Sequence, residues 1–297
     1  MDPTREGEFR PDPVDQTTGL EPGVARQRPL QAGSTFGRYR DLSFLGSGGM
    51  ATVYRAYDPT LDRPVALKLI RGEEPHLAER LLVEARAQAR IEHEHVCRIY
   101  EVGEEAGRPY IVMQFVDGGT LKDVQEELTL EQKLKVMKEV AEGVHAAHRV
   151  GFIHRDLKPT NVMVERTPEG GYHPYVMDFG LAREAAAPGL TATGMVMGTP
   201  WYMSPEQARG DSKILDRRSD VYSLGATLYE LLAGRPPFDS DSSLDVLVKL
   251  LNEEPVPVGS HHPQLPVDVQ TIVMKCLEKE PGQRYDSARA RMGSPSR

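Results

Sequence analysis

The period of the hydrophobic pattern changes near residue 120, and this change constrains the fold more than any other feature. From Phe36 to about residue 120, segments rich in β-branched and aromatic residues are separated by turn-like stretches such as DPTLDRP and EEAGRP. This pattern is typical of antiparallel strands, and we expect about five in a meander, interrupted by one helix over residues 76–91. After Thr120, apolar residues recur at helical spacing. The sequence therefore predicts a small sheet-rich lobe followed by a larger, mainly helical lobe, an α+β architecture.

The second part of the chain carries several local signals. Thr129, followed three positions later by Gln132, predicts the start of a long helix, and Gly151 lies where that helix should stop. The segment VYSLGATLYELLAG is apolar on nearly every face, which predicts a buried central helix. We expect short strands at FIHRD, NVMVE and YVMDFG, and a surface excursion at the polar stretch 165–174 between the last two.

Composition excludes several classes of protein. The 297 residues include 44 acidic and 36 basic side chains, a net charge of -8, which argues against a general nucleic-acid binder. Two cysteines cannot build a multi-bridge disulfide scaffold or a four-ligand zinc site, and they fit a reducing compartment, so we expect a cytoplasmic location. No run of apolar residues approaches the length of about eighteen that would predict a membrane span.

A glycine-rich turn lies between the first two predicted strands, and a lysine lies on the third. The turn contains Gly46, Gly48 and Gly49, and glycines let a backbone fold closely over phosphates. Because a strand and not a helix follows, the turn differs from a dinucleotide-binding loop, although an ordinary glycine-rich hairpin has the same pattern. Lys68 lies in VALK on the strand after next. A strand lysine is often only solvated, but Glu84 on the inward face of the predicted helix could be its partner.

Two further motifs complete an ordered series. HRDLKPTN contains Asp156, Lys158 and Asn161, DFG begins at Asp178, and SPE occupies residues 204–206. The order of glycine loop, VALK lysine, helix glutamate, HRDLKPTN, DFG and SPE is that of the protein kinase signature. The chain therefore resembles the protein kinases. It is most similar to the eukaryote-like (Hanks-type) serine/threonine kinases of bacteria, on GSGGMATVYRAYDPTLDRPVALK, LTATGMVMGTPWYMSPEQARG and SDVYSLGATLYELLAGRPPF.

The resemblance implies a two-lobed protein kinase fold over residues 36–289. An antiparallel-sheet N-lobe with one regulatory helix would end near residue 116, and a larger, mainly helical C-lobe would follow. We expect a disordered tail at residues 1–35, where prolines, glycines and charges are scattered, and a polar tail at residues 290–297. Only thirteen residues follow Arg284, so the last helix of the fold should be short or missing. The chain could be the catalytic module of a longer receptor or a truncated product.

The resemblance also implies an ATP site. The glycine loop would cover the phosphates, and Lys68, held by Glu84, would contact the α- and β-phosphates. Met113 would guard the back of the adenine pocket, and the backbones of Gln114 and Val116 would hydrogen-bond adenine. The residues expected to enclose the adenine ring are Leu45, Val53, Ala66 and Met163, for which plain core packing is the alternative.

For the chemistry, the resemblance implies that Asp156 accepts the proton of the substrate hydroxyl and that Lys158 neutralises charge on the moving phosphoryl group. Asn161 and Asp178 would bind two Mg²⁺ ions that bridge the phosphates. Thr199 is expected to hydrogen-bond around Asp156 and Lys158, with simple turn capping as the alternative.

Regulation would depend on a pair of threonines. Thr191 and Thr193 resemble the paired threonines that bacterial kinases of this type phosphorylate on themselves. A phosphate there would make charge-assisted hydrogen bonds to Arg155 and order the loop. The alternative is that both threonines are solvated loop residues.

Three polar residues are expected to support the architecture. Asp220 would brace the backbone of the HRD motif, and Glu206 and Arg284 would form a buried ion pair. Two positions depart from the family pattern. Ala51 replaces the third glycine of the loop, and Gln88 stands where an apolar residue is usual, which costs stability unless its amide is hydrogen-bonded.

The leading interpretation is an ATP-dependent serine/threonine protein kinase acting in signal transduction. Its substrates would be Ser or Thr hydroxyls of proteins. Two copies could form a transient homodimer in which each phosphorylates the other. A pseudokinase that signals by docking, or a small-molecule phosphotransferase of similar fold, is the alternative. The first usually lacks one of Lys68, Asp156 and Asp178, and the second has no use for a full activation segment. The sequence leaves open the substrate, the upstream signal and the oligomeric state.

Overall fold

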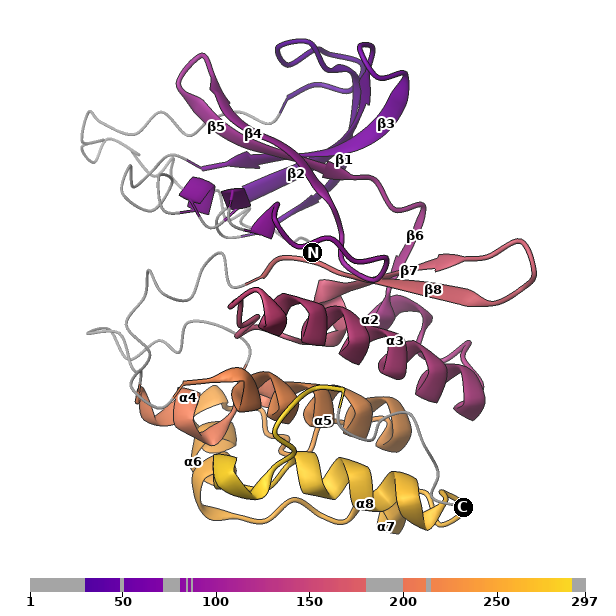
Figure 1. Cartoon of the computed structure of the whole chain (residues 1–297), viewed down its shortest axis with the longest axis vertical. Helices are drawn as coiled ribbons and strands as arrows, with labels where there is room; N and C mark the ends of the chain where they lie inside the picture. The colour runs from indigo at the N-terminus through magenta and orange to yellow at the C-terminus, as the bar shows by residue number, and fades with distance from the viewer. Residues whose placement is uncertain are drawn as a thin grey trace, which may run out of the picture.

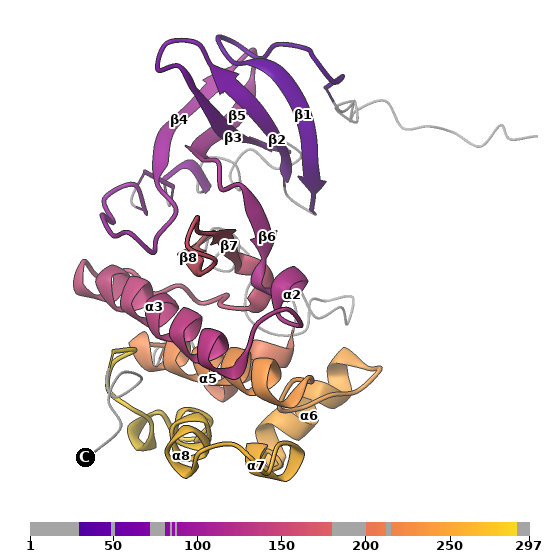
Figure 2. The ribbon, with the colours of Figure 1, turned by 90° about the vertical axis from the view of Figure 1, so that its right-hand side faces the viewer.

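The structure is a computed structural model of the chain and describes residues 30–48, 51–71, 81–83, 85, 86, 88–179, 200–211 and 215–289. A five-stranded sheet forms one end of the molecule, and most of the helices gather at the other end (Figure 1). In the view turned by 90° the sheet and the helices remain separate lobes (Figure 2). The expected two-lobed α+β architecture is therefore confirmed.

All neighbouring strands of the N-lobe sheet are antiparallel. The strands are β1 (Arg40–Ser47), β2 (Ala51–Asp58), β3 (Arg63–Ile70), β4 (Ile99–Glu105) and β5 (Arg108–Gln114). Their spatial order is β1-β2-β3-β5-β4, so the expected meander is wrong in one respect, because β5 lies between β3 and β4. The long connection from β3 to β4, which contains the helical residues 81–83, 85, 86 and 88, leaves room for this crossover.

Side chains of β3 alternate between two cores, as the pleat of a strand requires. Leu67 and Leu69 belong to an apolar cluster on the outer face of the sheet. Ala66 and Ile70 belong to a second cluster, on the face that packs against the helical segment. Lys68 lies between Ala66 and Ile70 in this alternation. Its side chain therefore points to the inner face of the sheet, as the predicted ATP site requires.

The segment before β1 packs on the outer face of the sheet. Leu30 contacts the outer cluster, and its backbone N–H donates to the hydroxyl of Tyr54 at 2.9 Å. The N–H of Gly33 donates to the carbonyl of Leu42 at 2.8 Å. The expected boundary of the disordered tail at residue 35 is therefore too late, because residues 30–35 make backbone bonds and apolar contacts that the local sequence pattern does not reveal.

A truncation that starts at Ser34 should be less stable than one that starts at Leu30. The shorter chain loses the burial of Leu30 and the backbone hydrogen bond of Gly33, which together contribute about 1 kcal/mol and correspond to a thermal midpoint about 2–4 °C lower. Differential scanning calorimetry of the two truncations measures this difference. Equal midpoints would show that the segment contributes nothing to the fold.

Three side chains converge on one carboxylate across the N-lobe sheet. Arg38 and Tyr39 precede β1, Glu101 lies on β4, and Tyr110 lies on β5. The hydroxyls of Tyr39 and Tyr110 donate to Glu101 at 3.0 and 2.5 Å, and the Arg38 guanidinium pairs with the same carboxylate. Because β1 and β4 are the two edge strands, this cluster joins the opposite edges of the sheet.

The C-lobe begins with a short strand and is mainly helical. Its strands are β6 (Gly118–Thr120), β7 (Val162–Arg166) and β8 (Tyr172–Val176), and they form a second antiparallel sheet. Its α-helices are α2 (Leu121–Val124), α3 (Leu130–Arg149), α4 (Pro205–Arg209), α5 (Arg217–Ala233), α6 (Ser243–Asn252), α7 (Val258–His261) and α8 (Val267–Cys276). Short 3-10 turns occupy Pro159–Asn161 (η1), Pro200–Tyr202 (η2) and Pro281–Gln283 (η3).

Two helices of the C-lobe follow the sequence signals closely. Helix α3 starts after Thr129, whose hydroxyl accepts from the Gln132 N–H while the Gln132 side chain accepts from the Thr129 N–H, as the capping box predicts. Helix α5 is buried over nearly its whole length and packs against α3 and α8 (Figure 2). It therefore provides the frame on which the other C-lobe elements are placed.

Two local expectations are wrong. The segment FIHRD is not a strand, because the N–H groups of His154 and Arg155 donate to the Asp220 side chain and not to a neighbouring strand. The stretch 165–174 is mostly a hairpin, since β7 and β8 pair from Val162 with Val176 to Arg166 with Tyr172. Only the turn between these two strands leaves the ladder.

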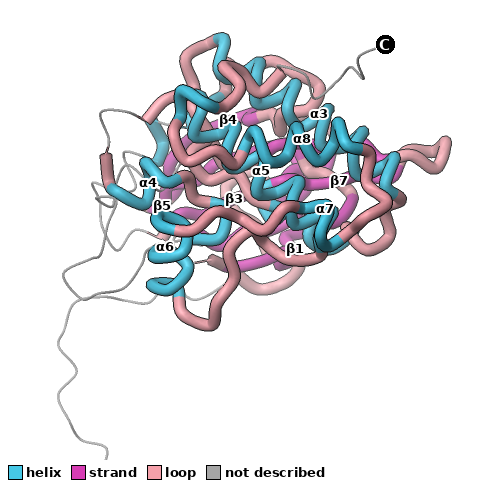
Figure 3. The backbone as a smooth tube through the Cα atoms, turned by 90° about the horizontal axis from the view of Figure 1, so that it is seen from below, coloured by secondary structure: helices cyan, strands magenta, loops and turns pink. Residues whose placement is uncertain are grey.

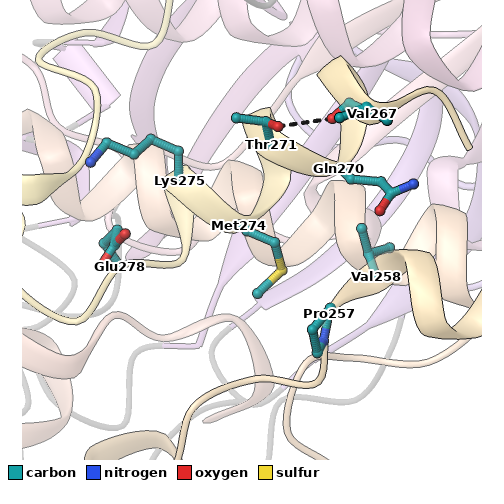
Figure 4. A pocket seen from close by; sticks show the side chains of 8 residues that line it. All are labelled: Pro257, Val258, Val267, Gln270, Thr271, Met274, Lys275 and Glu278. Atoms are coloured by element: carbon teal, nitrogen blue, oxygen red, sulfur yellow. Dashed lines mark hydrogen bonds between the residues drawn. The ribbon is translucent and has the colours of Figure 1, made fainter.

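A surface pocket of about 390 Å³ lies between α7 and α8, at the end of the molecule away from the N-lobe (Figures 1 and 4). Its lining side chains are Pro257, Val258, Val267, Gln270, Thr271, Met274, Lys275 and Glu278. The Thr271 hydroxyl donates to the carbonyl of Val267 at 2.9 Å (Figure 4). None of these residues belongs to the predicted ATP site. Within the described ranges, no helix combines the length and the apolar character needed to cross a bilayer.

Candidate active site

Asp220, in the first turn of the buried helix α5, holds the backbone of the HRD motif. Its two carboxylate oxygens accept from the N–H groups of His154 at 2.7 Å and Arg155 at 2.8 Å. Asp220 is fully buried, so these two charge-assisted bonds compensate for its lost hydration. The brace expected from the sequence is present, and it fixes the chain one residue before Asp156.

His148 is a supporting residue that sequence analysis missed. It lies in the last turn of α3, and its Nε2 is 2.7 Å from a carboxylate oxygen of Asp220. Both side chains are almost completely buried. A histidine at the end of a helix gives no local signal, because only the packing of α3 against α5 brings it to Asp220. The brace therefore connects α3, α5 and the HRD segment.

The predicted catalytic residues Asp156, Lys158 and Asn161 lie together in the segment that follows. The Lys158 ammonium donates to Oδ2 of Asp156 at 2.8 Å. The Asn161 amide nitrogen donates to the same oxygen at 3.1 Å and to the Asp156 backbone carbonyl at 2.7 Å. Since the NH₂ group of Asn161 is used in this way, its amide oxygen points away from Asp156. That oxygen is a hard ligand of the kind that Mg²⁺ prefers.

His154 connects this segment to the DFG motif. Its Nδ1 accepts from the Asp156 N–H at 3.3 Å, so the proton of the neutral ring is on Nε2, which donates to the Met177 carbonyl at 2.9 Å. Burial lowers the pKa of His154 despite the raising effect of Asp220 and Asp156, which agrees with a neutral ring. The ring also contacts the ring of Phe179, with centroids 4.6 Å apart. The two motifs are thus packed as one unit.

Lys68 of the N-lobe reaches Asp178 of the DFG motif. Its ammonium donates to Oδ1 of Asp178 at 2.6 Å, and both side chains are only partly exposed. Burial by itself would raise the pKa of Asp178, but the charge and hydrogen bond of Lys68 lower it overall, so Asp178 is an anion at neutral pH. Asp178 has φ 54°, a left-handed conformation that costs energy for a residue with a side chain.

The sheet register brings three of the predicted adenine-pocket residues together, namely Val53, Ala66 and Met113. Ala66 of β3 pairs with Met113 of β5, and both are buried in the inner cluster against which Val53 packs. Leu45 of β1 is half exposed. Val116 is buried, and Met163 of β7 is partly buried in the C-lobe sheet. The pocket would therefore be formed by β1, β2, β3, β5 and β7.

Both polar backbone groups of Gln114 have hydrogen-bond partners. Its N–H donates to the Arg98 carbonyl at 2.8 Å, and its carbonyl accepts from the Cys97 thiol at 3.6 Å. A carbonyl has two lone pairs and a thiol is a weak donor, so the Gln114 carbonyl can still accept from an adenine amino group.

The described part of the glycine loop leaves space above the backbone. The Gly48 N–H donates to the Ala51 carbonyl at 2.9 Å and closes the turn. A Cβ built on Gly46 or Gly48 would meet no atom of the described residues within 4 Å, so that part of the structure leaves the surface beside the loop open. Phosphates could approach the backbone there, which is the fit that an ATP site requires.

The two predicted metal ligands, Asn161 and Asp178, suit Mg²⁺ better than a transition metal. In the part of the chain that the structure describes, no group of three or more His, Cys, Asp or Glu side chains could hold a metal ion. Asn161 and Asp178 are joined through the backbone, since the Met177 N–H donates to the Asn161 carbonyl at 2.9 Å. One amide and one carboxylate suit Mg²⁺, which takes its remaining ligands from water and phosphates.

Behind the site, Glu206 and Arg284 form the expected buried ion pair. The guanidinium donates to both carboxylate oxygens at 2.7 and 2.8 Å, and both side chains have no exposed surface. Arg284 also donates to the carbonyls of Glu278, Lys279 and Arg218. The pair connects α4 to the C-terminal part of the lobe.

Five predicted residues lie outside the described ranges, namely Gly49, Glu84, Thr191, Thr193 and Thr199. The pairing of Lys68 with Glu84 and the threonine switch therefore stay predictions. Gln88 is described and is 4% exposed, and among the described residues its Oε1 has no hydrogen-bond partner. The cost expected for this glutamine is thus present in the structure.

Comparisons with known proteins agree with this geometry. The family model for the protein kinase domain matches residues 39–293. The serine/threonine-protein kinase PknB of Mycobacterium tuberculosis is 41% identical over 84% of this chain and 41% of its own length. PrkC of Bacillus subtilis is 36% identical over 85% of this chain and 39% of its own length. The chain therefore spans about two fifths of the length of these curated relatives.

Comparison with solved structures also indicates the protein kinase fold. The kinase domain of Mycobacterium tuberculosis PknI superposes with a TM-score of 0.70 and 25% sequence identity, covering 88% of this chain and 96% of that domain. The two-lobed fold, the ordered motifs and the family model all agree. The chain belongs to the protein kinase family.

Proposed function

We propose that this chain is an active ATP-dependent serine/threonine protein kinase. One observation carries the proposal. Asp156, Lys158 and Asn161 form a single hydrogen-bonded group, and Lys68 and Asp178 form a second one that connects the two lobes. All three residues whose loss usually marks a pseudokinase are therefore present and in contact with other site residues. The names of the relatives, serine/threonine-protein kinases, support the same substrate class.

In this proposal ATP and Mg²⁺ supply the phosphoryl group and the charge that neutralises it. Asn161 and Asp178 would hold the metal, and Lys68 would contact the phosphates. Asp156 would orient the Ser or Thr hydroxyl and accept its proton. Lys158, already 2.8 Å from Asp156, would balance negative charge beside the transferred group. Positioning and electrostatics supply most of the catalysis in this reaction class.

The regulation in this proposal is autophosphorylation at Thr191 or Thr193. Two copies of the chain would meet transiently, and each would modify the other. A phosphate at either threonine would add about two negative charges and would make charge-assisted hydrogen bonds to Arg155. We propose a cytoplasmic location and signal transduction as the biological role.

Incubation of purified protein with γ-labelled ATP and Mg²⁺, followed by phosphosite mapping, tests the function. Wild-type protein should transfer label to an acceptor protein such as casein, and protein purified from a bacterial host should carry phosphate on Thr191 or Thr193. The Asp156→Asn protein should carry none. Binding of ATP without any transfer by wild type would favour the pseudokinase instead.

A further inference from the structure

Arg155, the residue before the catalytic aspartate, has an unusual backbone. Its φ is 63°, the left-handed region that a residue with a side chain rarely adopts. Such a conformation persists only where surrounding contacts hold it, and it costs about 1–3 kcal/mol. The backbone conformation on both sides of Arg155 sets the direction in which the Asp156 side chain points. The contacts that fix Arg155 therefore also fix Asp156.

Two buried side chains hold the two polar backbone groups of Arg155. The N–H donates to Asp220 at 2.8 Å, and the carbonyl accepts from Nε2 of Gln207 at 2.8 Å. Gln207 lies on α4 and is only 6% exposed. Asp220 and Gln207 thus grip the same residue from two different helices. Gln207 directly follows the SPE residues 204–206, and the local sequence pattern does not predict its contact with Arg155.

The orientation of the Gln207 amide is determined by its other contacts. Its Oε1 accepts from the backbone N–H and the hydroxyl of Ser204, both at 3.1 Å. A flipped amide would place its NH₂ group against the Ser204 N–H donor and its oxygen against the Arg155 carbonyl. Both contacts would then be repulsive. The NH₂ group must therefore face Arg155.

Helix α4 is itself fixed against the same frame as Asp220. Its Glu206 accepts from the Ser219 hydroxyl of α5 at 2.7 Å and pairs with Arg284. Adjacent residues of α4 thus bind α5 and the HRD segment. This arrangement makes the position of Arg155 depend on α4 being in place.

We propose that Gln207 is a positioning residue for Asp156, acting through the carbonyl of Arg155. This role rests on the proposed kinase activity, in which Asp156 orients the acceptor hydroxyl. It also links the end of the segment that follows the DFG motif to the catalytic aspartate. A displaced α4 would release the Arg155 carbonyl and leave Asp156 less well aligned, although neither ATP nor metal would be touched.

The matched variants are Gln207→Glu and Gln132→Glu. Gln132 has the same capping-box role in α3, where its side chain accepts from the Thr129 N–H. Within the described residues, Gln132 forms no hydrogen bond with Arg155. Glutamate keeps the acceptor of the cap in both helices. Only at position 207 does the change remove a donor to a catalytic-segment carbonyl and place a negative charge beside it.

The kinetic readout is the split between kcat and KM, measured with ATP, Mg²⁺ and casein. Gln207→Glu should lower kcat about tenfold and leave KM for ATP within about twofold, because the misplaced group is Asp156 and not the nucleotide site. Gln132→Glu should leave both values unchanged. Gln207→Met, which adds no charge, should reproduce the fall in kcat. Wild-type kcat in Gln207→Met would overturn the proposal.

Hydrogen exchange of the peptide that covers residues 153–158 gives a second readout, which does not need activity. Exchange should be several-fold faster in Gln207→Glu and Gln207→Met than in wild type and Gln132→Glu, with α5 unchanged as the internal reference. Unchanged exchange in both Gln207 variants would overturn the proposal. If wild type transferred no phosphate, the proposed function would fail, but this measurement would still decide whether Gln207 holds the segment.

Discussion

Asp156→Asn is expected to bind ATP and Mg²⁺ with wild-type affinity and to lose phosphoryl transfer by about 10²- to 10⁴-fold, the contribution of a positioned general base. Asparagine keeps the shape of the side chain, and its oxygen can still accept from Lys158 and Asn161, whose bonds to Asp156 hold the segment together. It cannot accept the proton of the hydroxyl. Titration calorimetry with ATP and Mg²⁺ measures the binding, and a γ-labelled ATP assay measures the transfer.

Asp178→Asn is expected to lose Mg²⁺-dependent ATP binding as well. The change removes the carboxylate that pairs with Lys68 and that would hold the metal. Asp62→Asn is a matched control, since Asp62 also has a positive φ, 50° against 54° for Asp178, and lies in the turn between β2 and β3. The control should bind and transfer like wild type. Transfer at the wild-type rate by Asp156→Asn, or Mg²⁺-dependent binding by Asp178→Asn, would contradict the assigned roles.

Arg284→Met is expected to lower the free energy of unfolding by about 3–5 kcal/mol, because it leaves the buried Glu206 carboxylate without its partner. The exposed pair of Arg166 and Glu127 provides the control, and Arg166→Met should cost less than about 1 kcal/mol. Urea unfolding followed by circular dichroism measures both changes. A loss below 1 kcal/mol for Arg284→Met would show that the buried pair contributes no more than a surface pair.

The same ion pair predicts a dependence on pH. Burial alone would raise the pKa of Glu206, but the hydrogen bond and charge of Arg284 lower it below its ordinary value. A carboxyl with a lowered pKa stabilises the folded state above its unfolded pKa of about 4.3, and this contribution is lost as the pH falls through the folded pKa. In Arg284→Met, burial without the arginine raises the pKa of Glu206, so this carboxyl takes up a proton above about pH 4.3 and the penalty for its buried charge is relieved. The difference in stability between wild type and Arg284→Met should therefore narrow as the pH falls, starting above about pH 4.3 and continuing below it.

Residues that belong to local motifs could be placed from the sequence, and residues that act across elements could not. The capping box of Thr129 and Gln132 was predictable because both partners lie within one helical turn. The brace by Asp220 and the pair of Glu206 with Arg284 were expected only through the resemblance to kinases. His148 and Gln207 were missed because each depends on how separate helices pack, which no local pattern encodes.

The wrong expectations have a related cause. FIHRD has the composition of a strand, but a strand needs a neighbour, and Asp220 takes the N–H groups that a neighbour would bind. The alternation of residues in the N-lobe gives the number of strands but not which strands are neighbours, so the insertion of β5 between β3 and β4 was not predictable. Leu30 lies in a segment without a periodic apolar pattern, so its packing on the outer cluster was not predictable.

The strand order β1-β2-β3-β5-β4 also has a consequence for synthesis on the ribosome. The free edge of β3 cannot be covered by β4, which is made first, and must wait for β5. The end of β5 lies 44 residues after the end of β3. At about 5–20 residues per second, this interval lasts roughly 2–9 seconds. During it a largely apolar edge, PVALKLI, is unpaired on the nascent chain. The cluster around Glu101 includes Tyr110 of β5 and can be complete only afterwards, so the N-lobe finishes folding only after β5 has been made.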